Sequence, residues 1–306
     1  MAVQIPDALR AFKQPPPATL DAEQAWSAWR RRQRGLDRIE RALFSPWRAG
    51  FHPAWSARAD CDFAALEKLA EAGSGTVLKP GPGARVLRIK SDAAGIGKDS
   101  GPTLVLKHYP PTRRADPRDA CGRSKAARCV LAAHALIRRG FDVARPLAAW
   151  SKPGRGSWLL MEDLTEFVPL HRAAADCRGA AREHLLREVA QRVRRLHASG
   201  VAYRDLKPSN LLVREAHGRW DLALVDHDRN WFFRGPAPVA LARRDVAALQ
   251  AGLPPEVRAA ERARALSAYA PEWLERGAWR RQVRPLLREA ARRRHRWIPR
   301  RLLGGA

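Results

Sequence analysis

Apolar residues along the 306-residue chain recur at two spacings, which predict a strand-rich first half and a helix-rich second half. Short apolar runs bounded by glycine, proline or polar residues predict strands. Apolar residues at helical spacing between capping residues predict helices. The predicted strands are 76–78, 85–89, 104–106, 140–147 and 158–161. The predicted helices are 20–43, 62–72, 124–139, 182–198, 243–249, 256–269 and 273–301.

Two further apolar runs, 211–213 and 222–225, are joined by a turn at His217-Gly218. This pattern predicts a β-hairpin. A hairpin places Asn210, just before the first run, and Asp226, just after the second, at the same end of the ribbon. Carboxylate and carboxamide oxygens are ligands that magnesium prefers, so the sequence predicts Asn210 and Asp226 as metal ligands.

The stretch just before the hairpin reads YRDLKPSN, and its Asp205 and Asn210 are five residues apart. This is the D-x-x-x-x-N spacing of a kinase catalytic loop, and Lys207 lies inside it. Phosphoryl transfer needs a carboxylate near the attacking hydroxyl, a cation on the transferred group and metal on the phosphates. We therefore predict Asp205 and Lys207 as catalytic residues.

Features of the first half fit the binding of a nucleotide. Lys107 ends an apolar strand, where an ammonium can hold the α- and β-phosphates. Gly81 and Gly83 form a turn whose backbone amides can approach phosphate oxygens. Glu162 follows the strand at 158–161, where a hinge between two lobes would hydrogen-bond adenine. A solvated lysine and a plain hairpin turn remain alternatives for Lys107 and for the two glycines.

A kinase pairs its strand lysine with a glutamate on the next helix. The chain has no glutamate between positions 118 and 138, and Cys129 stands near the expected position. Asp119 and Glu71 are the acidic residues considered as substitutes. The partner of Lys107 is therefore left open by the sequence.

The motif YRDLKPSN resembles the H-R-D-L-K-P-x-N motif of protein kinases, with Tyr203 in place of histidine. V-D-H-D-R stands where those enzymes have D-F-G, no A-P-E follows, and the segment from Asp228 to Asp245 is short. Together with GTVLKPG at the first strand, these features resemble the bacterial lipopolysaccharide core kinases, over residues 66–269. The resemblance implies an α+β, two-lobed, protein-kinase-like fold: a basic extension with an amphipathic helix (1–60), a small, mainly antiparallel β N-lobe (61–162) and a mainly α C-lobe with a basic helical tail (163–306).

The same resemblance implies an enzyme that uses ATP and Mg²⁺ to phosphorylate a Kdo or heptose sugar of the lipopolysaccharide inner core. Such acceptors are lipid-linked, anionic and displayed on the cytoplasmic face of the inner membrane. Two alternatives remain. A protein Ser/Thr kinase shares the catalytic loop, and a pseudokinase scaffold would explain the missing helix glutamate and the altered D-F-G.

The net charge of +26 fits either a general excess of arginine or an anionic partner. The basic helices at 20–43 and 273–301 are candidates for contact with an anionic membrane surface, although docking on the protein or a solvated face is an alternative for each.

We expect no nucleic-acid partner, because zinc-finger, helix-turn-helix and RNA-recognition motifs are missing. The four cysteines form no C-x-x-C pair, which argues against zinc. The sequence shows neither a signal peptide nor an apolar run of about 18 residues. We therefore expect a cytoplasmic protein, and any contact with the membrane is expected to be peripheral.

Overall fold

The computed structural model describes seven stretches of the chain: 54–56, 63–73, 75–79, 84–90, 103–111, 124–152 and 154–297. The predicted helix at 20–43, the turn with Gly81 and Gly83, and Asp119 lie outside the described residues. The chain divides into two compact units, with the boundary between Thr165 and Glu166. Each unit is described by itself.

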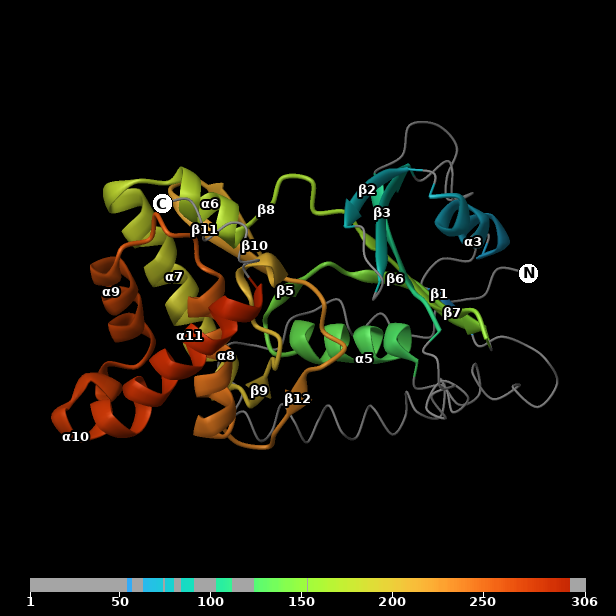
Figure 1. The fold of residues 1–306 in the computed structure, drawn as a ribbon. Coiled ribbons are helices and arrows are strands. Elements are labelled where there is room, and N and C mark those ends of the chain that lie inside the picture. Colours follow the sequence, from blue (N-terminus) through green and yellow to red (C-terminus); the bar gives the residue numbers. More distant parts are fainter. Residues whose placement is uncertain are drawn as a thin grey trace. The chain divides into compact units, whose positions relative to one another are not determined.

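The first unit is built on a six-stranded antiparallel sheet with the strand order β1-β6-β7-β4-β3-β2 (Figure 1). The three predicted strands at 76–78, 85–89 and 104–106 form β2, β3 and β4. The segment predicted as one strand at 140–147 instead holds two, because a break at 144–145 separates β5 from β6. The elements are β1 (Ala54–Ser56), α3 (Phe63–Ala72), β2 (Thr76–Lys79), β3 (Arg85–Lys90), β4 (Thr103–Tyr109), α5 (Lys125–Ile137), β5 (Asp142–Val143), β6 (Pro146–Lys152) and β7 (Gly156–Glu162).

Alternation of buried and exposed residues along β3 gives the sheet one face that packs against α3. On this face the indole rings of Trp150 and Trp158 stack, with centroids 5.8 Å apart. Glu67 of α3 is buried there and accepts a hydrogen bond of 3.0 Å from Trp150 Nε1. The same carboxylate pairs with Lys152, so α3 is fixed to the sheet by a satisfied buried charge as well as by apolar contact.

The second unit is mainly helical, with a small sheet in which β11, β10 and β8 lie side by side. This composition confirms the predicted α+β fold class. A 3₁₀ turn at Pro208–Asn210, another at Pro271–Leu274 and a π-helical turn at Trp279–Val283 interrupt the regular elements. The elements are β8 (Val168–Pro169), α6 (Leu170–Asp176), α7 (Gly179–Ala198), β9 (Val201–Ala202), β10 (Leu211–Ala216), β11 (Arg219–Leu224), β12 (Trp231–Phe232), α8 (Val239–Gly252), α9 (Ala259–Tyr269), α10 (Arg276–Ala278) and α11 (Arg284–Trp297).

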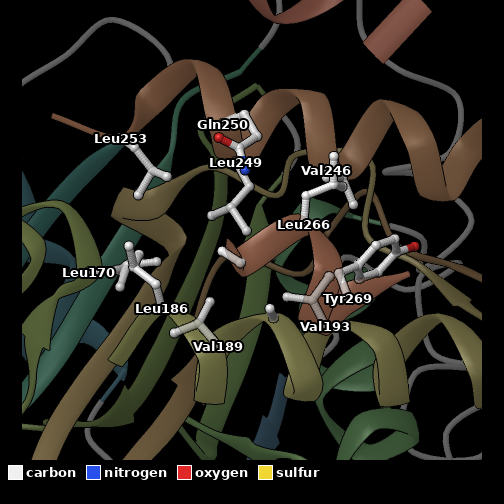
Figure 2. Close-up of a pocket in the computed structure, with 12 residues that line it drawn as sticks. Leu170, Leu186, Val189, Val193, Val246, Leu249, Gln250, Leu253, Leu266 and Tyr269 are labelled. Atoms are coloured by element: carbon white, nitrogen blue, oxygen red, sulfur yellow. The ribbon is translucent and has the colours of Figure 1, made fainter. Parts of the chain in front are cut away.

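The helices α6, α7, α8 and α9 enclose an apolar core around a small cavity (Figure 2). Its walls include Leu170, Val189, Val246 and Leu266. The cavity holds about 30 Å³, which is the space of about one water molecule and far less than a ligand pocket of several hundred Å³. It is therefore a packing gap in the core of the second unit.

Among the described residues, no helix combines the length and the apolar character needed to cross a membrane.

Candidate active site

The predicted hairpin is present and positions two of the candidate residues. Leu211 on β10 pairs with Leu224 on β11, and the turn residues His217 and Gly218 both have positive φ, as a tight two-residue hairpin turn requires. Just beyond the last pair, the backbone N–H of Val225 donates to the carbonyl of Asn210 over 3.1 Å. Asn210 and the residue that precedes Asp226 are thus opposite each other at one end of the ribbon.

Asp205, Lys207 and Asn210 come together in the loop before β10. Lys207 Nζ lies 3.0 Å from Asp205 Oδ2, and Asn210 Nδ2 donates to the carbonyl oxygen of Asp205 over 2.9 Å. The side chain of Asp205 is 22% exposed and that of Lys207 is 26% exposed, whereas Asn210 is buried. The loop therefore presents a carboxylate and an ammonium to solvent while a buried carboxamide fixes its shape.

Asp245, which the sequence analysis treated only as part of a helix start, anchors this loop from α8. Its carboxylate is buried and accepts two backbone hydrogen bonds, from Tyr203 N at 2.6 Å and from Arg204 N at 2.7 Å. His197 Nε2 lies 3.5 Å from the same carboxylate. Burying a carboxylate without hydrogen-bond donors would be unfavourable. Asp245 is the one acidic residue of α8, and its position beside an apolar run was the signal in the sequence for a buried, hydrogen-bonded carboxylate.

Tyr203, which stands where protein kinases have histidine, joins the catalytic loop to the segment after β11. Its hydroxyl donates to the carbonyl oxygen of Val225 and lies 3.2 Å from Nδ1 of His227. The Tyr203 side chain is fully buried. One aromatic residue thus sets the spacing between the loop that carries Asp205 and the segment that carries Asp226.

Backbone strain is located in the same two segments. Among the described residues, three other than glycine have positive φ: His217 in the hairpin turn, Arg204 (67°) and Asp226 (70°). Such conformations cost energy for residues with a side chain and persist where the surroundings enforce them, often at functional sites. Arg204 immediately precedes Asp205, the predicted catalytic carboxylate, and Asp226 is itself a predicted metal ligand.

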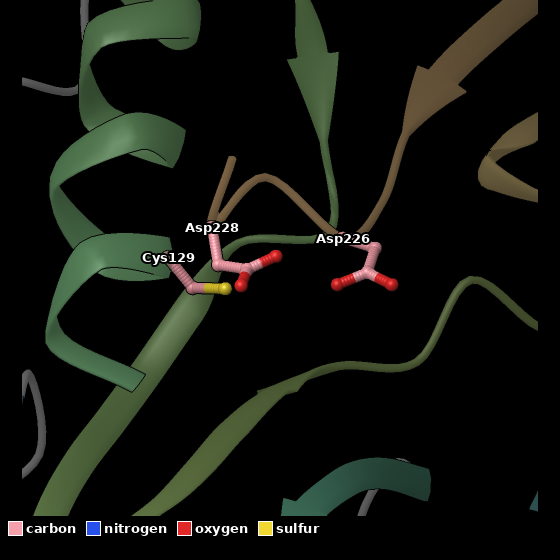
Figure 3. Close-up of side chains that lie close together, drawn as sticks. All are labelled: Cys129, Asp226 and Asp228. Atoms are coloured by element: carbon pink, nitrogen blue, oxygen red, sulfur yellow. The ribbon is translucent and has the colours of Figure 1, made fainter. Parts of the chain in front are cut away.

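Asp226 and Asp228 bring two carboxylates together after β11 (Figure 3). A carboxylate oxygen of Asp226 and one of Asp228 lie within 4.8 Å of each other, and both side chains are partly exposed. Asp226 was predicted as a metal ligand, whereas Asp228 had no predicted role. Two oxygen-bearing groups at this separation form a donor set that suits a hard cation such as Mg²⁺.

In the first unit, Lys107 lies on β4 and is largely buried, with Nζ 4.7 Å from the centroid of the Tyr109 ring. The hydroxyl of Tyr109 in turn lies 3.1 Å from Sγ of Cys129 on α5. Glu71, considered from the sequence as a partner for Lys107, instead pairs with Arg155. Tyr109 therefore contacts Lys107 through its ring and Cys129, which stands near the expected glutamate position, through its hydroxyl.

Glu162, which the sequence predicts at the entry to a hinge, is the last residue of β7. Its backbone N–H donates to the carbonyl of Arg145 over 2.9 Å, and its carboxylate lies 3.9 Å from Nε of Arg145. The next residue, Asp163, is tied back to the sheet by Arg88 and Thr103. These contacts give the start of the predicted hinge a defined conformation in the first unit.

Comparisons with known proteins agree with this geometry. The sequence profile of the lipopolysaccharide kinase (Kdo/WaaP) family matches residues 116–232. A search of curated protein sequences found no match. Among solved structures, one described as "WaaP in complex with acyl carrier protein" matches with a TM-score of 0.53 and 20% identity, covering 74% of this chain and 91% of that chain. At this identity the structural match shows a shared fold. The resemblance predicted from the sequence is confirmed, because residues 116–232, which contain the candidate catalytic loop, match the model of the lipopolysaccharide kinase (Kdo/WaaP) family.

Proposed function

We propose that the protein transfers the γ-phosphoryl group of ATP to a hydroxyl of a lipopolysaccharide inner-core sugar, either Kdo or heptose. The observation that carries the proposal is the loop in which Asp205, Lys207 and Asn210 are within hydrogen-bonding distance of one another. Their identities and spacing meet the needs of phosphoryl transfer, which depends on positioning and charge more than on covalent chemistry.

Asp205 is the group that accepts the proton of the attacking sugar hydroxyl. Its partial exposure leaves the carboxylate open to an acceptor, and its backbone is held by Asn210 on one side and by the Asp245-anchored residues Tyr203 and Arg204 on the other. Lys207 balances the charge of Asp205 before substrate binds, and its ammonium is free to turn toward the transferred phosphoryl group because its side chain is long and partly exposed.

The nucleotide is held by residues of the first unit. Lys107 binds the α- and β-phosphates, the backbone amides at Gly81 and Gly83 approach the phosphate oxygens, and the backbone that follows Glu162 takes the adenine. The burial of the Lys107 stem within β4 supports this role, because a buried stem limits the positions that the ammonium can take.

Asn210 and Asp226 would hold Mg²⁺, and we add Asp228 to this set because its carboxylate lies beside that of Asp226. The ion would neutralise charge on the phosphates of ATP. The position of Asp226 depends on its neighbours. Tyr203 and Asn210 both hydrogen-bond the backbone of Val225, the preceding residue, and these bonds help to hold Asp226 at its positive φ.

The acceptor is proposed to be lipid-linked and anionic, and the protein to act at the cytoplasmic face of the membrane. The net charge of +26 supports an anionic substrate, because long-range attraction raises the encounter rate with a molecule of opposite charge.

The proposal is tested by incubating the protein with ATP labelled at the γ position, magnesium and three separate acceptors: delipidated core oligosaccharide, free sugars and a mixture of proteins. Label on the oligosaccharide that requires Asp205 is the expected result, with Asp205→Asn as the matched variant. Label on serine or threonine alone would favour a protein kinase. Magnesium-dependent ATP binding with no transfer to any acceptor would favour a pseudokinase scaffold.

A further inference from the structure

The last helical run of the second unit carries a strongly basic face with an arginine-lined hollow. The hollow holds about 450 Å³ and lies between α8 and α11. Its lining is almost entirely cationic, comprising Arg243, Arg244, Pro285, Arg288, Glu289 and Arg292. The proposed kinase chemistry uses none of these residues.

The exposed guanidinium groups that line the hollow are available to bind an anionic partner. Arg244, Arg288 and Arg292 are exposed, and among the described residues no carboxylate pairs with any of the three. The one acidic residue in the lining, Glu289, already accepts a hydrogen bond of 2.8 Å from Arg293. Several guanidinium groups without carboxylate partners, gathered around one hollow, favour an anionic ligand.

The arginine cluster has a fixed base, because α8 is tied to the π turn that leads into α11. Pro285 has no N–H to donate to the carbonyl of Arg281, four residues earlier. Arg243 Nη1 supplies that donor from α8 instead, at 3.2 Å from Arg281 O and 3.3 Å from Gln282 Oε1. The basic face is thus displayed by two helices that are joined at a defined point.

Between residues 283 and 292, buried and exposed residues lie on different sides of the helix. Val283, Leu286 and Ala290 are buried, and α11 contacts α8. The opposite, exposed side carries Arg284, Leu287, Arg288, Ala291 and Arg292, which follow the i, i+3, i+4, i+7 pattern of one helix face.

Large apolar side chains lie within this otherwise cationic run. Leu287 is 52% exposed, between Arg284 and Arg288 on the exposed face, and Trp279 is 44% exposed in the π turn just before α11. A π turn takes up one residue more than an α turn, which rotates Trp279 toward the side of Leu287. Arginines that flank an exposed leucine and tryptophan are typical of a helix that lies on an anionic lipid surface, with its apolar groups among the acyl chains.

We propose that this face docks the protein on a phospholipid surface rich in anionic headgroups. Arg244, Arg288 and Arg292 contact headgroup phosphates, and Leu287 and Trp279 enter the interface. The apolar pair selects a lipid surface over a nucleic acid, because burying them against lipid is favourable whereas a phosphate backbone offers them little. The inference stands apart from the proposed kinase activity and concerns only where the protein binds.

The test is co-sedimentation of the full chain with vesicles of phosphatidylcholine, with and without phosphatidylglycerol, at low and high ionic strength. Binding is expected only with phosphatidylglycerol, and it is expected to weaken as salt is added. The double variant Arg288→Glu/Arg292→Glu should bind at least about tenfold more weakly, since each basic residue at such a surface contributes roughly fivefold.

A matched control is Arg187→Glu/Arg195→Glu on α7, which makes the same change in net charge at two exposed arginines outside this face. The control should bind within about twofold of the unchanged protein. Leu287→Ser should weaken binding at an unchanged net charge, which a purely electrostatic attraction does not predict.

Equal losses in the two double variants would overturn the proposal, because net charge alone would then explain binding. So would vesicle binding that is insensitive to Arg288→Glu/Arg292→Glu, or retention by duplex DNA but not by vesicles. Circular dichroism of each variant confirms folding. Phosphoryl transfer to a delipidated acceptor should be unchanged in the arginine variants, so loss of docking and failure of the kinase assignment are told apart.

Discussion

The guanidinium carbon of Arg204 lies 3.9 Å from the centroid of the Trp231 ring. This contact joins the catalytic loop, which contains Arg204, to β12, which follows the segment of Asp226 and Asp228. The backbone strengthens the connection, because Trp231 pairs with Ala202 in the β12–β9 ladder. Arg204 has a positive φ, and the stacked ring is one of the contacts that hold it there.

Replacing Trp231 with alanine should therefore loosen the catalytic loop without removing a catalytic group. We expect kcat to fall about two- to tenfold, in line with a cation–π contact of roughly 0.5–1.4 kcal/mol, while KM for ATP changes little. Trp231→Phe keeps a ring face and should retain most of the rate. Steady-state kinetics of both variants checks this, and alanine and phenylalanine variants with the same kcat as the unchanged protein would contradict it.

Asp245 is expected to matter for stability as well as for activity. Asp245→Ala leaves the N–H groups of Tyr203 and Arg204 without their acceptor, at a cost of about 2–4 kcal/mol in the free energy of unfolding. Asp245→Asn keeps one acceptor oxygen and should lie between the alanine variant and the unchanged protein. Urea unfolding followed by circular dichroism measures the effect, and three indistinguishable midpoints would show that the carboxylate does not anchor the loop.

Asp226 and Asp228 should differ in how their loss affects magnesium dependence. Asp226→Ala is expected to lower turnover at least about a hundredfold at any magnesium concentration, because a ligand of the ion that neutralises the phosphates is removed. Asp228→Asn retains an oxygen at its position and should mainly raise the magnesium concentration that gives half-maximal rate. A titration of rate against magnesium distinguishes the two, and near-normal turnover by Asp226→Ala would remove Asp226 from the site.

The buried imidazole of His134, on α5, is expected to reduce the stability of the protein in mild acid. Burial lowers the pKa of His134 from 6.5 to about 4, and the charge of Arg138 acts in the same direction. Between these values the unfolded chain binds a proton that the folded protein excludes, so the free energy of unfolding falls as the pH drops. The loss from this group is about 2 kcal/mol by pH 5.

The His134→Gln variant has no proton to take up in this range. Its urea midpoint should therefore change less between about pH 7 and about pH 5 than that of the unchanged protein. Comparison of the two proteins at both pH values isolates His134 from the other titrating groups. Equal pH dependence in both would contradict a depressed pKa at this position.

The sequence predicted the hairpin because its signals are local. Apolar runs on both sides of His217-Gly218 define the strands, and the relation of Asn210 to Asp226 follows from strand pairing alone. The two helices of the first unit were also predicted from local signals: Gly73, where α3 was expected to end, has a positive φ, and α5 begins after Ser124, whose side chain caps it.

Several helix boundaries were missed, and so were two roles that depend on contacts between distant segments. The α8 helix begins at Val239 after Pro238, earlier than predicted, and α9 begins at Ala259, where Arg258 and Glu261 form the cap. The tail was predicted as one helix over 273–301, but a 3₁₀ turn at Pro271–Leu274 and a π turn at Trp279–Val283 precede α11. The roles of Asp245 and Trp231 could not be predicted, because each acts on a loop that is distant in sequence.

The most direct test of the account is whether the protein makes a phosphomonoester on core oligosaccharide. The delipidated oligosaccharide is treated with ATP and magnesium, then examined by ³¹P NMR and mass spectrometry, with Asp205→Asn treated in parallel. We expect one new phosphomonoester on a Kdo or heptose residue with the unchanged protein, and a rate at least about a hundredfold lower with Asp205→Asn. An oligosaccharide that stays unmodified while the protein phosphorylates other acceptors, or equal modification by both proteins, would contradict it.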